Sequence, residues 1–246
     1  MEHVVKSGQT LSEIANIFNT SIADICQANN IEDVNIIKVD QVLIIPNSLN
    51  KDNIKEKVNK FINFIESKKI KKSISSIAKS SIELIFQKCL EFDITDIRMI
   101  SYILATTHWE TGAYGQRFIY EPVPEQGKGK GKAYGISHKK TGKVYYGRGF
   151  VQITWFDNYE RFTKILNKLG HDVDLVNNPD LALKPEIAVL ILVIGMKDGK
   201  FTGRDLSDYF TSTKSDYYNA RKIINGLDKA VIIADIAKEI HYIIKW

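Results

Sequence analysis

An apolar segment of this sequence recurs at helical spacing and ends in an acid. Its apolar residues begin at Met99 and lead to His108-Trp109-Glu110-Thr111-Gly112. Glycine is common directly after a helix, so Glu110 is expected in the last turn, at the negative end of the helix dipole. The dipole and the apolar neighbours Leu104 and Trp109 both disfavour a negative charge there. The pattern therefore predicts a carboxyl group that keeps its proton, as a general acid requires.

A second segment, Tyr145 to Tyr159, is rich in aromatic, amide and hydroxyl side chains punctuated by glycines. Glycines at 147 and 149 allow a ligand to approach the backbone closely. Polar side chains of this kind suit hydroxyl and N-acetyl groups, while the aromatic rings can stack on sugars or fill the core. Arg148 can pair with a carboxylate and so orient a catalytic glutamate. The candidate ligand-binding side chains are those of Tyr146, Arg148, Gln152, Thr154, Asn158 and Tyr159.

The periodicity of the chain from about residue 73 onward is mainly helical. Helices are expected where apolar residues recur from Ile77 to Leu90, from Thr95 as N-cap to Glu110, and over 155–169, 185–197, 217–225 and 232–246. Only a short extended piece is expected, near 143–146. The sequence therefore predicts a mainly α fold for this part.

The N-terminal segment, about 3 to 46, predicts strand, helix, helix and strand in that order. Thr10 and Glu13 have the spacing of a capping box, and the run 42–46 resembles a strand stopped by proline. The segments Val5 to Ala15, Asn29 to Ile31 and Gln41 to Pro46 resemble a LysM module, with Gln9 and Asp40 at two positions where that family differs. This resemblance implies a small βααβ domain that binds N-acetylglucosamine-containing glycans.

The two segments of the C-terminal part resemble glycoside hydrolase family 19. His108 to Gly112 is similar to the His-Glu-Thr-Gly segment of that family, where Trp109 either separates the His from the Glu or replaces the family's His. Tyr145 to Thr154 is similar to its Tyr-Tyr-Gly-Arg-Gly strip. Residues 178–182 and 221–226 match in the same order. The resemblance implies a lysozyme-like α-rich fold and an inverting cleavage of peptidoglycan or chitin. It makes Glu110 the acid and adds His108 and Asn225 to the substrate-binding set.

An inverting glycosidase also needs a carboxylate base, which the resemblance places on a loop after the acid. Glu121 and Glu125 both fit. We prefer Glu125, because it precedes the Gly/Lys-rich stretch 126–132 and lies nearer the Tyr145 strip in sequence, and we keep Glu121 as the alternative. No metal ion and no other cofactor is expected.

These patterns divide the chain into a LysM module at 1–47, a helical linker at 48–72 and a catalytic domain at 73–246. The lysine run at 68–72 has no interleaved aromatic residue, which favours a solvated boundary over a nucleic-acid site. The longest apolar runs are too short to span a bilayer, and a monomer is expected. Met1 leads directly into the patterned segment, so we expect no signal peptide and action at the bacterial wall after release by phage lysis or an injection apparatus.

Two alternatives to a glycosidase remain open from the sequence. A wall amidase or peptidase would need paired metal ligands or a reactive cysteine, but the five histidines show no His-Glu-x-x-His spacing and Cys89 lies on an apolar helical face. A non-catalytic glycan-binding protein would rely on the LysM module alone. The acid at position 110 and the intact strip favour the enzyme.

Overall fold

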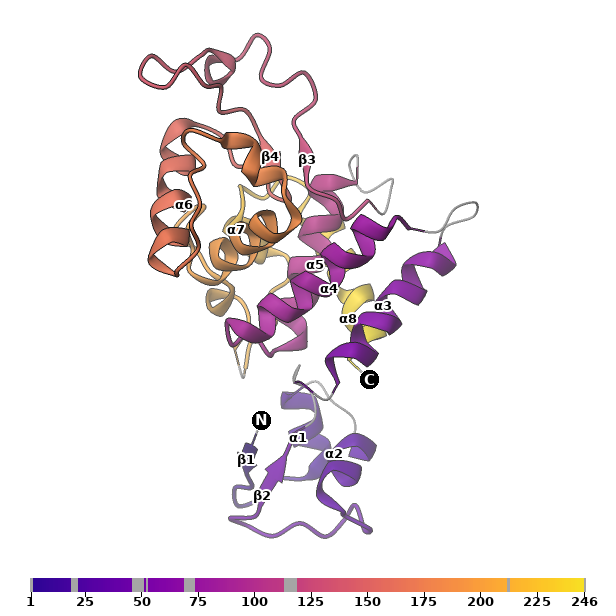
Figure 1. Cartoon of the computed structure of the whole chain (residues 1–246). Helices are drawn as coiled ribbons and strands as arrows, with labels where there is room; N and C mark the ends of the chain where they lie inside the picture. The colour runs from indigo at the N-terminus through magenta and orange to yellow at the C-terminus, as the bar shows by residue number, and fades with distance from the viewer. Residues whose placement is uncertain are drawn as a thin grey trace.

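The computed structural model describes residues 2–18, 22–45, 51, 53–68, 74–112, 119–211 and 213–245, and these are mainly α-helical. In Figure 1 a small N-terminal unit lies at one end, and a larger helical body lies above it. The long excursion between strands β3 and β4 projects from the far side of that body. The predicted fold class, a mainly α protein with a small βααβ domain at the N-terminus, is confirmed.

The N-terminal unit contains β1 (Glu2–Val4), α1 (Leu11–Ile17), α2 (Ile22–Asn29) and β2 (Val42–Ile44). The two strands pair antiparallel, with His3 opposite Leu43. The predicted capping box is present, since Thr10 accepts from the Glu13 backbone and Glu13 accepts from the Thr10 backbone. A separate small core holds the unit together, formed by Val5, Leu11, Ile14, Ala15, Ile25, Leu43 and Ile45.

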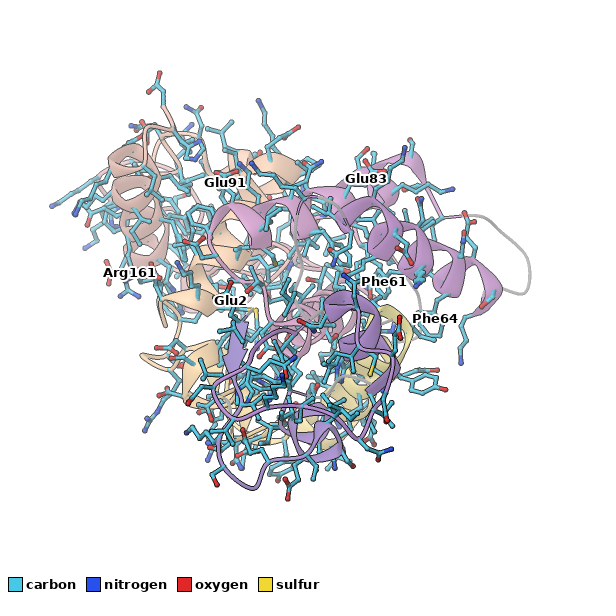
Figure 2. All side chains as sticks on the ribbon, turned by 90° about the horizontal axis from the view of Figure 1, so that it is seen from below. Glu2, Phe61, Phe64, Glu83, Glu91 and Arg161 are labelled. Carbon is cyan, nitrogen blue, oxygen red and sulfur yellow. The ribbon has the colours of Figure 1, made fainter. Side chains whose placement is uncertain are left out.

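Helix α3 (Ile54–Lys68) occupies the segment that the sequence predicts as a helical linker. Its buried side chains belong to the same core cluster as those of α4 and α8, so it is part of the helical body rather than a free spacer. Phe61 is fully buried and packs on the rings of Phe86 and Tyr120, whereas Phe64 is only partly covered; both are labelled in Figure 2. The expected boundaries at 47 and 72, Pro46, and most of the lysine run lie outside the described residues.

The helical body is built around α5 (Ile97–Thr111), which packs along α8 (Ala230–Ile244). Helix α4 (Ser76–Glu91) packs against α7 (Pro185–Lys197) and α3, and α6 (Phe156–Lys168) lies at the other side of the body from α3 (Figures 1 and 2). Nearly all of α5 is buried, which explains why its apolar residues lie on every side of the helix. Its last turn, with Glu110, is therefore fixed by packing on several sides.

Three local predictions for this part are wrong in detail. The N-cap of α5 is Asp96, whose carboxylate accepts from the Arg98 backbone, and not Thr95. The segment predicted as a helix at 217–225 contains only a short 3-10 helix, Asn219–Ile223. The extended pair of this region is β3 (Val123–Pro124), which was not predicted, with β4 (Arg148–Gly149), which lies a few residues after the predicted 143–146.

Within the described ranges, none of the helices is both long and apolar enough to cross a bilayer.

Candidate active site

Glu110 is the penultimate residue of α5 and remains partly exposed, with 19% of its side chain accessible. Its Oε1 accepts a hydrogen bond from Nη1 of Arg221 at 2.7 Å. The guanidinium is itself almost fully buried. A carboxyl group at a helix end, open to solvent on one side and held by a buried cation on the other, can meet a ligand in a defined orientation.

Arg221 reaches this position from the 3-10 helix at Asn219–Ile223. Its Nε donates to the carbonyl of Asp228 at 3.1 Å, which fixes the plane of the guanidinium before Nη1 meets Glu110. An arginine held at two separate nitrogens has little freedom to rotate. The orientation of Glu110 is therefore set by a segment that follows it by more than a hundred residues.

Glu125 follows β3 directly and lies beside the strip predicted from the sequence. Its backbone N–H donates to the carbonyl of Gly147 at 2.7 Å, and its Oε2 accepts from the Gly147 N–H at 3.1 Å. Its Oε1 accepts from the hydroxyl of Tyr134 at 2.7 Å. This hydrogen bond, more than burial, raises the pKa of Tyr134 above its ordinary value, so the hydroxyl stays protonated and remains the donor.

Glu121, the alternative base, lies four residues earlier and has a different environment. Its Oε1 accepts from the hydroxyl of Ser75, the N-cap of α4. The preceding residue, Tyr120, is fully buried and stacks on the ring of His108 with centroids 5.9 Å apart. Because His108 lies two residues before Glu110 in α5, this contact ties the backbone at Glu121 to the end of that helix.

The strip from Tyr145 to Tyr159 folds around the buried guanidinium of Arg148. Nη1 donates to the carbonyls of Val144 and Tyr146 and to the hydroxyl of Tyr159, at 3.0 to 3.2 Å. The Tyr146 ring lies over the guanidinium at 3.5 Å from its centroid, and the Tyr159 hydroxyl donates to the Tyr146 carbonyl. Burial raises the pKa of Tyr159, which keeps that hydroxyl protonated.

The carboxylate that pairs with Arg148 is that of Asp180, at 2.7 Å from Nε, and not that of a candidate catalytic glutamate. The orienting role expected for Arg148 toward such a glutamate falls to Arg221 instead. Arg148, Tyr146 and Tyr159 are buried and bind one another. Their side chains therefore support the backbone of the strip from inside the protein.

The other polar residues of the strip hold its backbone. Gln152, at a φ of +53°, donates from Nε2 to the carbonyls of Val123 and Gly149 and so ties the strip to β3. Thr154 donates to the Gln152 carbonyl, and Asn158 donates to the Thr154 carbonyl at 2.7 Å. These three side chains are partly exposed, and within the described residues the side-chain amide oxygens of Gln152 and Asn158 accept no hydrogen bond.

His108 and Asn225 lie in contrasting places. His108 is buried in the core of α5, with its ring on Tyr120. Asn225 is exposed after the 3-10 helix, and its Oδ1 accepts from the Gly226 N–H while its own N–H donates to the Arg221 carbonyl. Asn225 thus adjoins the arginine that holds Glu110.

Three contacts of the candidate carboxylates were not predicted from the sequence, those of Arg221, Tyr134 and Ser75. Arg221 lies in one of the segments that resemble the hydrolase family, so its position in that match is the one signal that points to it. Tyr134 and Ser75 carry no local pattern that would connect them to a carboxylate. Only their hydrogen bonds to Glu125 and Glu121 do so.

Metal-binding side chains do not gather in this site. In the part of the chain that the structure describes, no three His, Cys, Asp or Glu side chains lie together as metal ligands would. The two carboxylates of the site are instead met by hydroxyl, amide and guanidinium donors.

Comparison with known proteins gives matches at the N-terminus. Residues 3–46 match the LysM domain family. N-acetylmuramoyl-L-alanine amidase XlyA of Bacillus subtilis (strain 168) is 51% identical over 43 residues, which are 18% of this chain and 14% of that protein. Secreted LysM effector ELP2 of Colletotrichum higginsianum (strain IMI 349063) is 50% identical over 50 residues, which are 20% of this chain and 28% of that protein.

The chain thus spans less than a third of the length of either curated relative. A crystal structure of a chitinase C mutant aligns with 92% of this chain and 93% of its own, at 16% sequence identity and a TM-score of 0.41. That likeness is too weak to define a shared fold. The predicted family of the N-terminal segment is confirmed, and residues 3–46 are a LysM domain.

Proposed function

We propose that this chain is a cell-wall glycan hydrolase in which the LysM domain holds an N-acetylglucosamine-containing polymer and the helical body cleaves it. The observation that carries the proposal is the partly exposed Glu110 carboxyl at the end of α5, oriented by the buried Arg221. The motifs around Glu110 and Arg148 also resemble those of glycoside hydrolase family 19. Two modules that point independently to the same class of polymer support this function.

In the proposed mechanism Glu110 protonates the oxygen of the β-1,4 bond that breaks. A second carboxylate removes a proton from a water molecule, which attacks the anomeric carbon from the opposite face and inverts its configuration. The two carboxyl groups of such a pair lie about 6.5 to 9.5 Å apart in inverting enzymes, which leaves room for the water. No metal ion takes part in this scheme.

Glu125 is the proposed base, with Glu121 as the second candidate. Glu125 is supported by its attachment to the strip, since Tyr134 and Gly147 hold both of its oxygens. A carboxylate has about four lone-pair sites, so a water can still be accepted. Glu121 is supported by the packing of Tyr120 on His108, close in sequence to Glu110.

The LysM domain would raise the local concentration of the catalytic body on its insoluble substrate. Action at the bacterial wall, after release by a phage lysis system or delivery by an injection apparatus, is part of the same proposal. A non-catalytic glycan-binding protein is the main alternative, because a LysM domain can hold the polymer without cleavage.

The test compares the wild-type chain with Glu110→Gln on purified peptidoglycan and on chitin oligomers. Reducing ends should appear with the wild type and fall by about 10²–10⁴-fold with Glu110→Gln, because the amide cannot donate the proton. Polymer pull-down should be unchanged, because the LysM domain is intact. Equal hydrolysis by both chains would reject the acid, and binding without any hydrolysis would favour the non-catalytic alternative.

A further inference from the structure

An aromatic hollow of about 470 Å³ lies where the segment after Glu125 meets the start of α6. We define it by Tyr134, Ile136, His138, Trp155 and Phe156. His138 stacks on Phe156 with centroids 4.2 Å apart and nearly parallel planes, and Tyr134 meets Trp155 edge to face at 5.4 Å. These contacts fix the walls, while Trp155 and Ile136 remain 52% and 71% exposed. A rigid aromatic surface is thus left open to solvent.

Trp155 has a backbone conformation that residues other than glycine rarely adopt, with φ of +72° and ψ of +142°. A non-glycine residue in this region is strained, and such strain tends to lie at functional sites. The residue is held there by its N–H bond to the Tyr145 carbonyl at 2.9 Å and by its carbonyl, which accepts from Asn158. Because half of the residue is exposed, core packing does not account for an indole at this strained position.

The aromatic hollow is connected to the proposed active site through one side chain. Tyr134 forms part of its wall and donates its hydroxyl to Glu125 Oε1. A ligand seated on Trp155 would therefore lie one side chain away from the proposed base. This position suits a sugar unit near the bond that is cleaved.

The rim of the aromatic hollow is cationic, because Lys139 and Lys140 line it. Within the described structure neither lysine forms a salt bridge with a carboxylate. The sequence from 126 to 156 contains no Asp or Glu, and of the two acids that flank it Glu125 accepts from Tyr134 and Gly147 while Asp157 is exposed at the start of α6. Such a field favours a ligand that carries a negative charge.

From this arrangement we propose that the aromatic hollow is a subsite for an acidic N-acetylated sugar, with Trp155 stacking on the sugar ring and Lys139 and Lys140 meeting its carboxylate. The inference rests on the proposed function and deepens it. Chitin units carry no carboxylate, whereas alternate units of the peptidoglycan glycan carry a lactyl group, which ends in a free carboxylate wherever the stem peptide has been removed; elsewhere its carboxyl forms an amide with that peptide. The subsite therefore selects peptide-free stretches of the peptidoglycan glycan over chitin.

The test uses the full chain with Glu110→Gln, so that the ligands are not consumed. The chain has three tryptophans, at 109, 155 and 246, and the LysM segment has none. The indole N–H signals in NMR spectra therefore do not report directly on a sugar bound to the LysM domain. Loss of one signal in Trp155→Phe assigns it. The probes are a peptide-free peptidoglycan tetrasaccharide with free lactyl carboxylates and the chitin tetramer.

The Trp155 signal should shift with the acidic tetrasaccharide at a concentration about three- to tenfold lower than with the chitin tetramer, because exposed ion pairs contribute modestly. This difference in concentration between the two sugars should disappear at 0.5 M salt and in the double variant Lys139→Gln/Lys140→Gln. It should persist in the control Lys164→Gln/Lys168→Gln, which removes two exposed lysines of α6. Equal affinities at low salt, or an unmoved Trp155 signal with both sugars, would overturn the proposal.

Trp155→Gly provides an independent variant. Glycine accepts the local backbone conformation, so the variant should keep a melting temperature within a few degrees of wild type and raise KM on peptide-free peptidoglycan glycan. A large drop in melting temperature or an unchanged KM would assign the ring to packing and overturn the subsite. If the wild type hydrolyses neither polymer but the titration behaves as expected, the proposed function fails and the subsite stands.

Discussion

Arg221 holds Glu110 through a 2.7 Å contact between residues 111 positions apart in the sequence. The contact joins the end of α5 to the 3-10 helix that precedes α8, and α5 and α8 pack along each other. The main helix packing of the body thus brings the candidate acid and its positioning arginine together.

Replacing Arg221 by lysine should lower the rate of peptidoglycan hydrolysis by about 10²-fold, since small misplacements of a reacting group cost this much. Lysine keeps the charge but cannot bond Asp228 and Glu110 together from one rigid plane. The release of reducing ends and the far-UV circular dichroism spectrum should be measured side by side.

The matched control is Arg204→Lys, because Arg204 is exposed and its carboxylate partner is 3.9 Å away. It should hydrolyse at the wild-type rate. A wild-type rate in Arg221→Lys would remove the positioning role.

Glu125→Gln should lower hydrolysis by about 10²–10⁴-fold, because an amide cannot accept the proton of the attacking water. Glu121→Gln should retain most of the activity, since Glu121 accepts a hydrogen bond from Ser75, the N-cap of α4. Initial rates on one peptidoglycan preparation would compare the two variants directly. A large loss in Glu121→Gln alone would transfer the role of base to Glu121.

Phe61→Ala should destabilise the helical body by about 3–5 kcal/mol, the usual cost of removing a fully buried phenylalanine. Urea denaturation followed by circular dichroism would measure the loss. The control is Val231→Ala in α8, since Val231 is 60% exposed and should change little. If Phe61→Ala unfolds like the wild type, α3 is a spacer and not part of the core.

The buried His241 should make the protein less stable in acid. Burial, with a smaller effect of the Lys245 ammonium, lowers the pKa of His241 from 6.5 to about 4. The unfolded chain then binds a proton more readily, so the stabilisation is present above about pH 6.5 and is lost as the pH falls toward 4. The loss amounts to about 3 kcal/mol for this shift.

The free energy of unfolding, measured in urea from pH 7.5 to 4, should fall more steeply in wild type than in His241→Gln. Glutamine can still meet the Tyr217 hydroxyl, which lies 3.1 Å from Nδ1 of His241, but it does not titrate. Parallel pH curves for the two proteins would contradict the assignment.

The sequence by itself determined the local elements and the identity of the candidate acid. The capping box at Thr10 and Glu13, the LysM pattern and the apolar periodicity of α5 all depend on neighbours a few residues apart. For the same reason Glu110 is found in the last turn of α5, as predicted. Errors arose where local propensity was weak, as at the short 3-10 helix Asn219–Ile223.

The tertiary structure alone decided how the carboxylates are held. Arg221 on Glu110, Tyr134 on Glu125 and Asp180 on Arg148 are contacts between segments that local pattern cannot relate. The contact of Arg221 depends on how α5 and α8 pack, that of Tyr134 on the folding of the segment between β3 and β4, and that of Asp180 on the packing of β4 against the 3-10 helix Pro179–Leu183. Hydrogen bonds demand atoms within about 3 Å, and only packing over the whole body fixes positions that closely.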